Sequence, residues 1–445
     1  MYLRRNFIFA MTLLLGICLP ISQHGASAQI IELGPDEAIR LALENNLTLK
    51  KSLIDLAASG YSEKRLWAEI FPTISASAST GFQSPLFSGD GFELNDNTKI
   101  NSIGLGLNLG FSAGTYYSIK SIQLAHQSNL LRYEEASKQL SIQVTKYFYS
   151  LAAEKNNLDY LKVIFSLSER QYERNQVSFR NGLIGERALM QSRLSVENAR
   201  YNLSAAGISY ANNLGEFLST LGMAQNADVS LLGDIKITKI DADAEYLIRE
   251  YLPKRPDIVR SNQEIERLIY AERQTYMQGR SPSLNLSMNW ENRKFDPHID
   301  TLSGTARLTI PVDSWIPGTP RSQTFMKAND SIKKARMDLT IAQDAAKNQI
   351  RSLSVLLRNS WDSIQIARLS LEVAQRSYQL TDEGFRNGIV ESLELEEVRN
   401  NMASARQRLL QSELSYFNMI LELSAALNIE WKKIIELYGV PGEKE

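Results

Sequence analysis

The sequence predicts a mostly α-helical protein with membrane β-strands, in which each chain is an internal duplication. The motif Phe-Arg-Asn-Gly occupies residues 179–182 and recurs at 385–388, and the offset of 206 residues holds for about ninety residues around it. Four further segments change from helical spacing to strict alternation of apolar and polar residues. A repeat of this length fixes the domain plan before any local motif is considered.

Both copies carry an apolar seam whose residues recur every three or four positions, the spacing of helices in a coiled coil. Seams of about 50 residues indicate an elongated assembly of long helices. The seam consists of Tyr133, Leu140, Val144, Tyr147, Leu151, Leu158, Leu161, Phe165, Tyr172 and Phe179 in the first copy, and of Leu339, Ala346, Ile350, Leu353, Leu357, Ile364, Ala367, Leu371, Tyr378 and Phe385 in the second.

Residues 1–28 are predicted to be a secretory signal peptide. Arg4 and Arg5 precede an apolar run at 7–21, and the segment ends in an A-x-A cleavage pattern at 26–28. A membrane anchor is the alternative. Pro20 interrupts the run, however, and the run is shorter than the roughly 20 residues that a spanning helix needs.

The composition excludes several classes of function. Cys18 is the only cysteine, so cleavage after residue 28 removes any basis for disulfides, thiol catalysis or cysteine-bound metal. The bulky Ile17 before it disfavours lipid attachment. The remaining chain has 47 basic and 50 acidic residues, a balance that offers no basic face for nucleic acid.

Each repeat follows the order helix, strand, strand, long helix pair. The first helix begins near Pro35, with acidic residues in the turn where the helix dipole favours them. Pro72 and Pro282 end the helices that precede the strands, because proline cannot continue a helix. The predicted division is a first repeat at 29–222 with strands 73–82 and 102–111 and long helices 115–221, an insertion at 223–243, a second repeat at 244–430 with strands 283–292 and 303–312 and long helices 320–429, and a C-terminal tail at 431–445.

The four strands have the properties of membrane-spanning strands. A strand of about ten residues crosses a bilayer when tilted, and Phe82, Phe111 and Trp290 lie near strand ends, where interfacial aromatic residues are common. An antiparallel sheet with one wet face is the alternative that alternation leaves open. Because the smallest membrane barrels have eight strands, a barrel built from four strands per chain requires oligomerisation.

Several short motifs follow one another along the chain, namely Asp36-Glu37-Ala38-Ile39, Ala42-Leu43-Glu44-Asn45-Asn46, Phe71-Pro72-Thr73-Ile74-Ser75, Arg255-Pro256-Asp257 and Ser281-Pro282-Ser283-Leu284-Asn285. In this order and spacing they resemble the TolC-like outer-membrane factor family. The resemblance implies a homotrimer in the bacterial outer membrane, with a 12-stranded barrel continuous with a 12-helix periplasmic tunnel. It also implies that 223–243 is the family's equatorial insertion.

The resemblance further assigns roles to residues at both helix turns. Alignment on Gly388 places a periplasmic gate at Phe385, Glu394 and Glu397, and the two glutamates share one helix face. The resemblance implies that a tyrosine hydroxyl and an arginine charge can contribute to the gate at these positions, and Phe385 and Val390 supply neither. A solvated helix face is the alternative for the glutamates. Adaptor-docking grooves fall at the turns, on Gly182, Leu183, Gly388 and Ile389, whose glycines also suit helix C-caps.

The expected function is that of a passive exit duct in a tripartite efflux or type I secretion system. Its implied partners are a periplasmic adaptor (membrane fusion protein), an inner-membrane transporter of the RND, ABC or MFS type, and outer-membrane lipid, with no cofactor or metal. An enzyme is disfavoured because no nucleophile elbow or phosphate loop appears, and the one HxD motif, 298–300, falls in a predicted external loop. The alternative is a periplasmic coiled-coil adaptor or a structural protein without a pore, which would not need the four strands.

Overall fold

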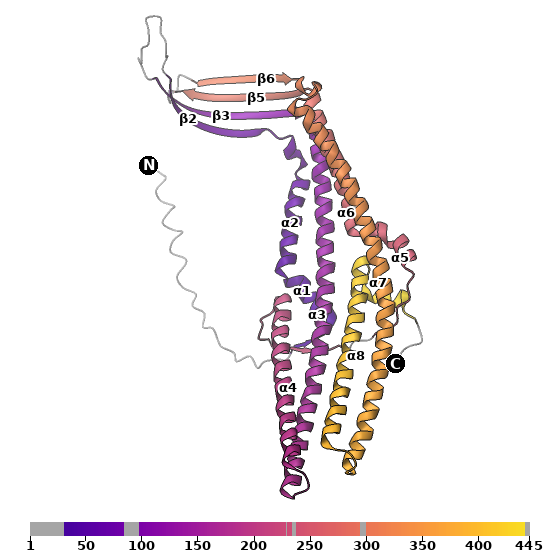
Figure 1. Cartoon of the computed structure of the whole chain (residues 1–445). Coiled ribbons are helices and arrows are strands. Elements are labelled where there is room, and N and C mark those ends of the chain that lie inside the picture. Colours follow the sequence, from indigo (N-terminus) through magenta and orange to yellow (C-terminus); the bar gives the residue numbers. More distant parts are fainter. Residues whose placement is uncertain (1–30, 84–97, 228, 234–236, 294–299, 441–445) are drawn as a thin grey trace, which may run out of the picture.

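The computed structural model describes residues 31–440 apart from 84–97, 228, 234–236 and 294–299. The predicted signal peptide, the HxD histidine and most of the loop after the first membrane strand therefore lie outside the described residues. The molecule is elongated, with a sheet at one end, two helical hairpins at the other, and short elements packed around the middle (Figure 1).

The two repeats share the order short helix, longer helix, two strands and a pair of long helices, and differ in their short elements. The first consists of β1 (Ile31–Leu33), α1 (Pro35–Asn45), α2 (Leu47–Lys64), η1 (Leu66–Glu69), β2 (Thr73–Gln83), β3 (Thr98–Ser112), α3 (Gly114–Arg180) and α4 (Glu186–Thr220). After β4 (Val229–Leu231), the second consists of α5 (Ala244–Tyr251), η2 (Leu252–Lys254), α6 (Pro256–Arg280), β5 (Ser283–Arg293), β6 (Asp300–Thr309), η3 (Asp313–Trp315), α7 (Pro320–Arg386) and α8 (Ser392–Leu427), followed by α9 (Trp431–Tyr438).

Helices α3 and α7 extend from the sheet to the hairpin tips. Each has 67 residues, which corresponds to about 100 Å at 1.5 Å per residue. Each turns at its tip into a shorter antiparallel partner, α4 or α8, of 35 and 36 residues. Within the described ranges, no helix is both long enough and apolar enough to cross a membrane.

The four-stranded sheet has the strand order β2-β3-β5-β6, and every pairing is antiparallel. Its register places apolar side chains in rows on one face. One such row is Ala76, Leu105, Trp290 and Leu302, and the neighbouring row on the other face is Ser75, Gly106, Asn289 and Ser303. Among the described strands, β2 and β6 each pair on one side only, so both edges of the sheet are open.

Two strands differ in extent from the sequence pattern. β3 runs from Thr98 to Ser112, longer at both ends than the predicted 102–111. β6 covers Asp300–Thr309 and not 303–312, because its ladder with β5 begins opposite Asn292 and ends opposite Ser283. Pro311 has no N–H to extend that ladder. The prediction that Ile310 and Val312 belong to this strand is therefore wrong.

Two apolar cores lie around the middle of the molecule. The first core is formed mainly by the first repeat, where Phe148 and Phe217 are fully buried, and Leu421 of α8 in the second repeat is fully buried in it as well. The second repeat buries Ile350, Trp361 and Tyr416 between α7, α8 and the 237–242 segment. These cores join the two repeats into one body, because helices from one repeat pack on the other.

The predicted C-terminal tail is structured over its first part. Residues 431–438 form α9, whose Ile434 is fully buried in the core of the second repeat. The isolated bridge between Gly439 and Ile240 then ties the chain to the insertion. The period of α9 places Trp431, Ile434 and Ile435 toward this core, a pattern too short to stand out in the sequence.

The seams become less buried toward the tips. Val144 and Ile350 are fully buried near the cores, whereas Tyr172 and Tyr378 are only partly buried. On this lower stretch of α3 the buried residues include the polar Gln171 and Asn175, which share a hydrogen bond of 3.0 Å. A single chain therefore contributes less apolar packing to its tips than to its middle.

Candidate functional site

The hairpin tips have the same backbone geometry in both repeats. At the first tip the N–H of Leu183 donates to Ser178 O at 2.9 Å, and that of Gly182 donates to Phe179 O at 2.9 Å. The second tip repeats these bonds from Ile389 to Gly384 O at 2.9 Å and from Gly388 to Phe385 O at 3.0 Å. Both patterns are Schellman caps, which require a left-handed residue at the glycine position.

Gly182 and Gly388 have φ values of +73° and +75°, in the region where side chains are strained. No atom lies within 4 Å of a Cβ built on either glycine, so the space above the turn is open in the single chain. The next residues are apolar and exposed, Leu183 at 74% and Ile389 at 80%. Each tip therefore presents an open turn directly followed by an exposed apolar side chain.

The residues assigned to the gate lie on both sides of the second tip. Phe385 is half-buried near the end of α7, and Glu394 and Glu397 are exposed on the first two turns of α8. Within the described residues, neither glutamate forms an ion pair. The ion pairs at this tip are Asp382–Arg386 at 2.6 Å and Glu396–Arg399 at 3.5 Å.

The Glu396–Arg399 pair was not singled out in the sequence, although its spacing of three residues on a helix is a recognisable signal. Arg399 is buried, and its Nε has no hydrogen-bond partner among the described residues. Val390 packs on the end of α7, since a Cβ on Gly384 would meet its side chain at 2.7 Å. The local packing at this tip is therefore partly apolar.

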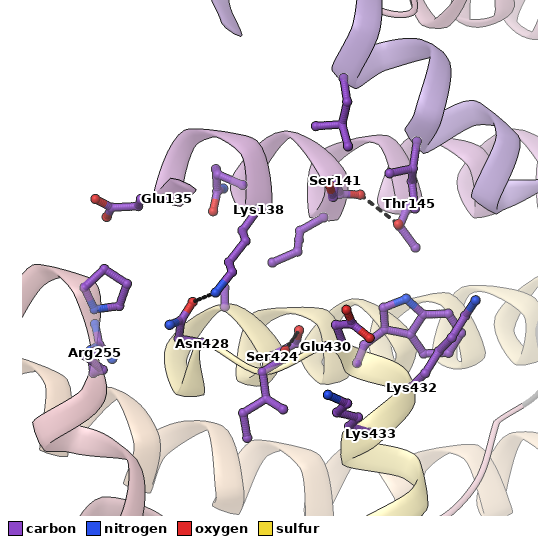
Figure 2. A pocket seen from close by; sticks show the side chains of 18 of the residues that line it. Glu135, Lys138, Ser141, Thr145, Arg255, Ser424, Asn428, Glu430, Lys432 and Lys433 are labelled. Carbon is purple, nitrogen blue, oxygen red and sulfur yellow. Dashed lines mark hydrogen bonds between the residues drawn. The ribbon is translucent and has the colours of Figure 1, made fainter. Parts of the chain in front are cut away.

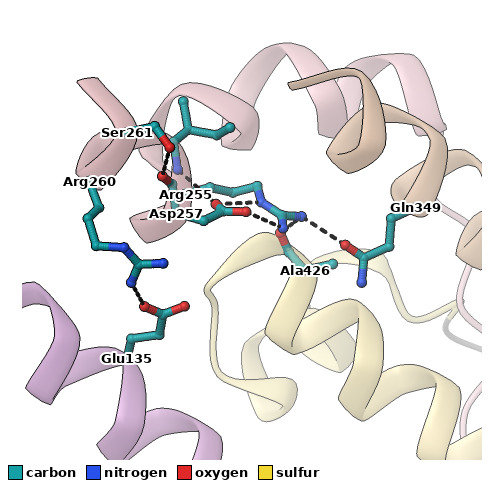
Figure 3. Close-up of polar contacts among 8 residues, drawn as sticks. Glu135, Arg255, Asp257, Arg260, Ser261, Gln349 and Ala426 are labelled. Carbon is teal, nitrogen blue, oxygen red and sulfur yellow. Dashed lines mark hydrogen bonds and ion pairs between the residues drawn. The ribbon is translucent and has the colours of Figure 1, made fainter. Parts of the chain in front are cut away.

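A second polar centre lies at the start of α6, where the Arg255-Pro256-Asp257 motif falls (Figure 3). Arg255 binds Asp257 through two hydrogen bonds of 3.0 and 2.8 Å and donates to the carbonyl of Ala426 at 3.0 Å and to Gln349 at 3.2 Å. Burial raises the pKa of Asp257, but the Arg255 guanidinium and the backbone N–H of Ile258 outweigh it and hold that pKa below its usual value.

A cavity of about 610 Å³ lies beside this centre, between α3 and the α8–α9 junction (Figure 2). Lys138 reaches across it to Asn428 at 2.8 Å, and acidic Glu135 and Glu430 also line it. Sequence patterns do not predict this cavity, because residues on its opposite walls are 290 positions apart in the chain. Among the described residues, no group of three or more His, Cys, Asp or Glu side chains is placed to hold a metal.

The model of the outer membrane efflux protein family matches residues 38–222 and 247–428, which together make up most of the chain. The chain belongs to the outer membrane efflux protein family. The two matched segments correspond to the two repeats, so the family resemblance and the duplicated fold predicted from the sequence are confirmed. Membership places the protein in the outer membrane with an extension into the periplasm. No curated protein matches the sequence.

Solved outer-membrane channels share the fold at low sequence identity. The Campylobacter jejuni CmeC outer membrane channel is 19% identical, with a TM-score of 0.71 over 90% of this chain and 88% of that chain. The open state of the Neisseria gonorrhoeae MtrE outer membrane channel is 15% identical, with a TM-score of 0.70 over 91% of this chain and 93% of that chain. The outer membrane protein VceC from Vibrio cholerae is 13% identical, with a TM-score of 0.69 over 89% of this chain and 96% of that chain. Each comparison covers nearly the full length of both chains.

Proposed function

We propose that three copies of this chain form a passive exit duct, with their sheets closed into one barrel and their hairpins into one tunnel. The open edges of the four-stranded sheet carry this proposal. Exposed edge strands pair with further strands, and a membrane barrel needs at least eight. Three chains together supply 12 strands, and the apolar rows of the sheet then face lipid while the polar rows face the lumen.

The tips are the proposed docking surface for a periplasmic adaptor. Leu183 and Ile389 supply exposed apolar contacts, and the open turns at Gly182 and Gly388 let another backbone approach closely. The adaptor connects the duct to an inner-membrane transporter of the RND, ABC or MFS type, in efflux or in type I secretion. That transporter supplies the energy, and the duct performs no chemistry.

The proposed gate lies just above the second tip. Threefold symmetry brings Glu394 and Glu397 of all three chains around the axis, so six carboxylates gather at one constriction. Carboxylates at that density attract cations and bind divalent ions, which narrow the entrance. Their exposure in the single chain and their lack of an ion-pair partner among the described residues support this role.

Fractionation and conductance test the proposed duct. The protein should leave the outer membrane only in detergent, migrate differently on gels before and after heating, and give stable cation-conducting channels in planar bilayers. A protein released from cell envelopes without detergent, with no conductance after reconstitution, would favour a periplasmic adaptor or structural role and refute the duct.

A further inference from the structure

An arginine is enclosed by aromatic rings where α6 meets the membrane sheet. The Arg280 guanidinium lies 4.7 Å from the ring centre of Tyr276, 4.9 Å from that of Trp315 and 5.3 Å from that of Phe325. The rings come from three elements, α6, η3 and α7. Cation–π contacts of this kind stabilise a cation in a partly desolvated place without neutralising its charge.

Two local features build this arrangement. Gly279 is buried against Phe325, and a Cβ on that glycine would meet the ring at 2.5 Å, so only glycine allows the ring so close to Arg280. The buried Ser314 hydroxyl donates to the carbonyl of Gly279 at 2.6 Å and fixes η3 against the end of α6. Trp315 is thereby held beside the guanidinium. We call Arg280 with Tyr276, Trp315 and Phe325 the arginine cage.

The cation in the cage has no anionic partner in the described part of the chain. Its one hydrogen bond there is from Nη1 to the Tyr276 hydroxyl at 3.0 Å, and its Nε is buried without a partner. The nearby acid Asp313 instead pairs with Arg321 at 2.8 Å. A guanidinium covered by rings and lacking a carboxylate retains donors for a planar or tetrahedral oxyanion.

Apolar side chains around the cage are exposed. Ile310, Val312, Trp315 and Ile316 follow β6 with exposed fractions of 55% to 69%. These residues follow directly after the end of β6. An exposed apolar group with tryptophan and tyrosine, placed where a membrane-spanning strand ends, is typical of the level of lipid headgroups.

We propose that the arginine cage binds the phosphate of a glycerophospholipid in the periplasmic leaflet of the outer membrane, while its acyl chains cover the exposed apolar residues. The proposal rests on insertion of the sheet into the membrane, as in the proposed duct. Arginine matches a phosphodiester because it donates several hydrogen bonds from a rigid plane. The lipid then fixes the height of the barrel relative to the bilayer through the second repeat.

Native mass spectrometry of the detergent-purified full-length assembly tests this site with two probes of the same acyl chains, dioleoyl phosphatidylglycerol and dioleoylglycerol. The wild type should retain the phospholipid preferentially. Arg280→Gln should lose roughly fivefold to tenfold of that retention, as expected for a charge-assisted contact. Lys327→Gln, which removes an exposed cation from the neighbouring turn of α7, should behave as the wild type.

Several outcomes would overturn the lipid site. Equal retention of both probes by the wild type, or unchanged phospholipid retention in Arg280→Gln, would exclude phosphate recognition by the cage. Displacement by an equal concentration of inorganic phosphate would assign the cage to a free anion. If Arg280→Gln lowered only the melting temperature of the lipid-free assembly and left phospholipid retention unchanged, the cage would be a packing contact within the chain and not a lipid site.

These results are separable from a failure of the duct itself. If the duct proposal is wrong, the wild type and every variant leave the envelope without detergent and give no conductance. If only the lipid site is wrong, all variants remain in the outer membrane and conduct as before, and their phospholipid retention is the same.

Discussion

The two repeats have nearly identical backbone geometry at their tips but differ at several charged positions. Gly182 and Gly388 end helices of equal length with the same cap. The positions of Glu394 and Glu397, by contrast, are occupied in the first repeat by Ala188 and Gln191. The repeats therefore share the backbone geometry of the hairpins, while the two acids assigned to the gate are present in the second copy alone.

The second repeat also has a charged group where the first has a neutral one at two other places, the break between its short and longer helices and the junction with the sheet. The break between short and long helices is capped in the first repeat by the neutral side chain of Asn46, which accepts from the N–H groups of Thr48 and Leu49. In the second repeat an ion pair, Arg255–Asp257, occupies that place. At the membrane junction, the first repeat has the apolar Ile70 and Phe71 before Pro72, where the second has Arg280 before Pro282.

The largest expected effect tests the part that the repeats share. Gly182→Trp and Gly388→Trp should each abolish capture of the adaptor hairpin, because each places a bulky side chain in the open turn. The strain of a left-handed tryptophan, about 1–2 kcal/mol, should leave the assembly intact. Pull-down of the adaptor, with the assembly followed on unheated gels, measures both.

Asparagine at the same positions is the matched control, since it tolerates positive φ. Gly182→Asn and Gly388→Asn should retain capture. Normal capture by both tryptophan variants would place docking elsewhere, and loss from only one would show that the tips, despite their common backbone, are not equivalent in function.

The next prediction concerns the Arg255–Asp257 ion pair at the break between α5 and α6, which has no counterpart at the break between α1 and α2. Asp257→Asn retains an oxygen for the N–H of Ile258 but leaves the largely buried Arg255 without its counter-charge. We expect a loss of about 2–3 kcal/mol in the free energy of unfolding, near the lower limit for breaking a buried pair because Asp257 is partly exposed. Thermal unfolding in detergent measures it.

Glu250→Gln is a suitable control, because it breaks the exposed pair with Lys254 just before the same break. It should not change the melting temperature measurably. An Asp257→Asn variant as stable as Glu250→Gln would mean that the second repeat needs the ion pair no more than the first repeat does.

A smaller effect on ion conductance is expected from Glu394 and Glu397, the two gate residues whose counterparts in the first repeat are neutral. The double variant Glu394→Gln with Glu397→Gln should reduce cation selectivity by roughly twofold to threefold and weaken divalent block, since a cluster of carboxylates concentrates cations. Bilayer recordings with and without added Mg²⁺ measure both. Glu186→Gln, in the first turn of α4, changes an acid at the other tip and should leave selectivity nearly unchanged.

The smallest expected effect concerns two arginines related by the repeat. Arg406 on α8 stacks on Tyr160 of α3 at 4.5 Å and so joins the two hairpins, whereas Arg200 stacks on Phe165 within its own hairpin at 5.7 Å. Arg406→Gln should weaken hairpin contact by about 1 kcal/mol and speed hydrogen exchange in the lower part of α8. Arg200→Gln should leave that exchange unchanged. Equal exchange rates in both variants would show that the Arg406 contact does not hold the two hairpins together.

The sequence predicted the elements whose signals are long and repeated. The tips could be located because a glycine beyond a helical seam is a local cap signal, and the strands because alternation changes the period. The limits of β6 were misplaced because apolar alternation continues through Ile310 and Val312, whereas the ladder with β5 depends on pairing across the sheet.

Features that depend on distant segments were out of reach of pattern reasoning. The cavity at Lys138, the Arg255 contact with Ala426 and the arginine cage each join elements that only the folded chain brings together. The gate assignment came from the family resemblance, and its role remains a prediction. In each case the missing information was which helices face each other.

Cross-linking of the open sheet edges tests the trimeric duct most directly. Ser303→Cys in β6 is combined in turn with a cysteine at Ser77, Ser79 or Gly81, which lie on one face of β2, because closing a barrel staggers neighbouring strands along their length. Within a chain, three strand spacings, at least roughly 14 Å, separate β2 from β6. A shorter bis-maleimide should therefore link neighbouring chains only. The account predicts products of two and three chains and none larger. A ladder beyond three, an end point at two, or no product from any of the three pairs would contradict it.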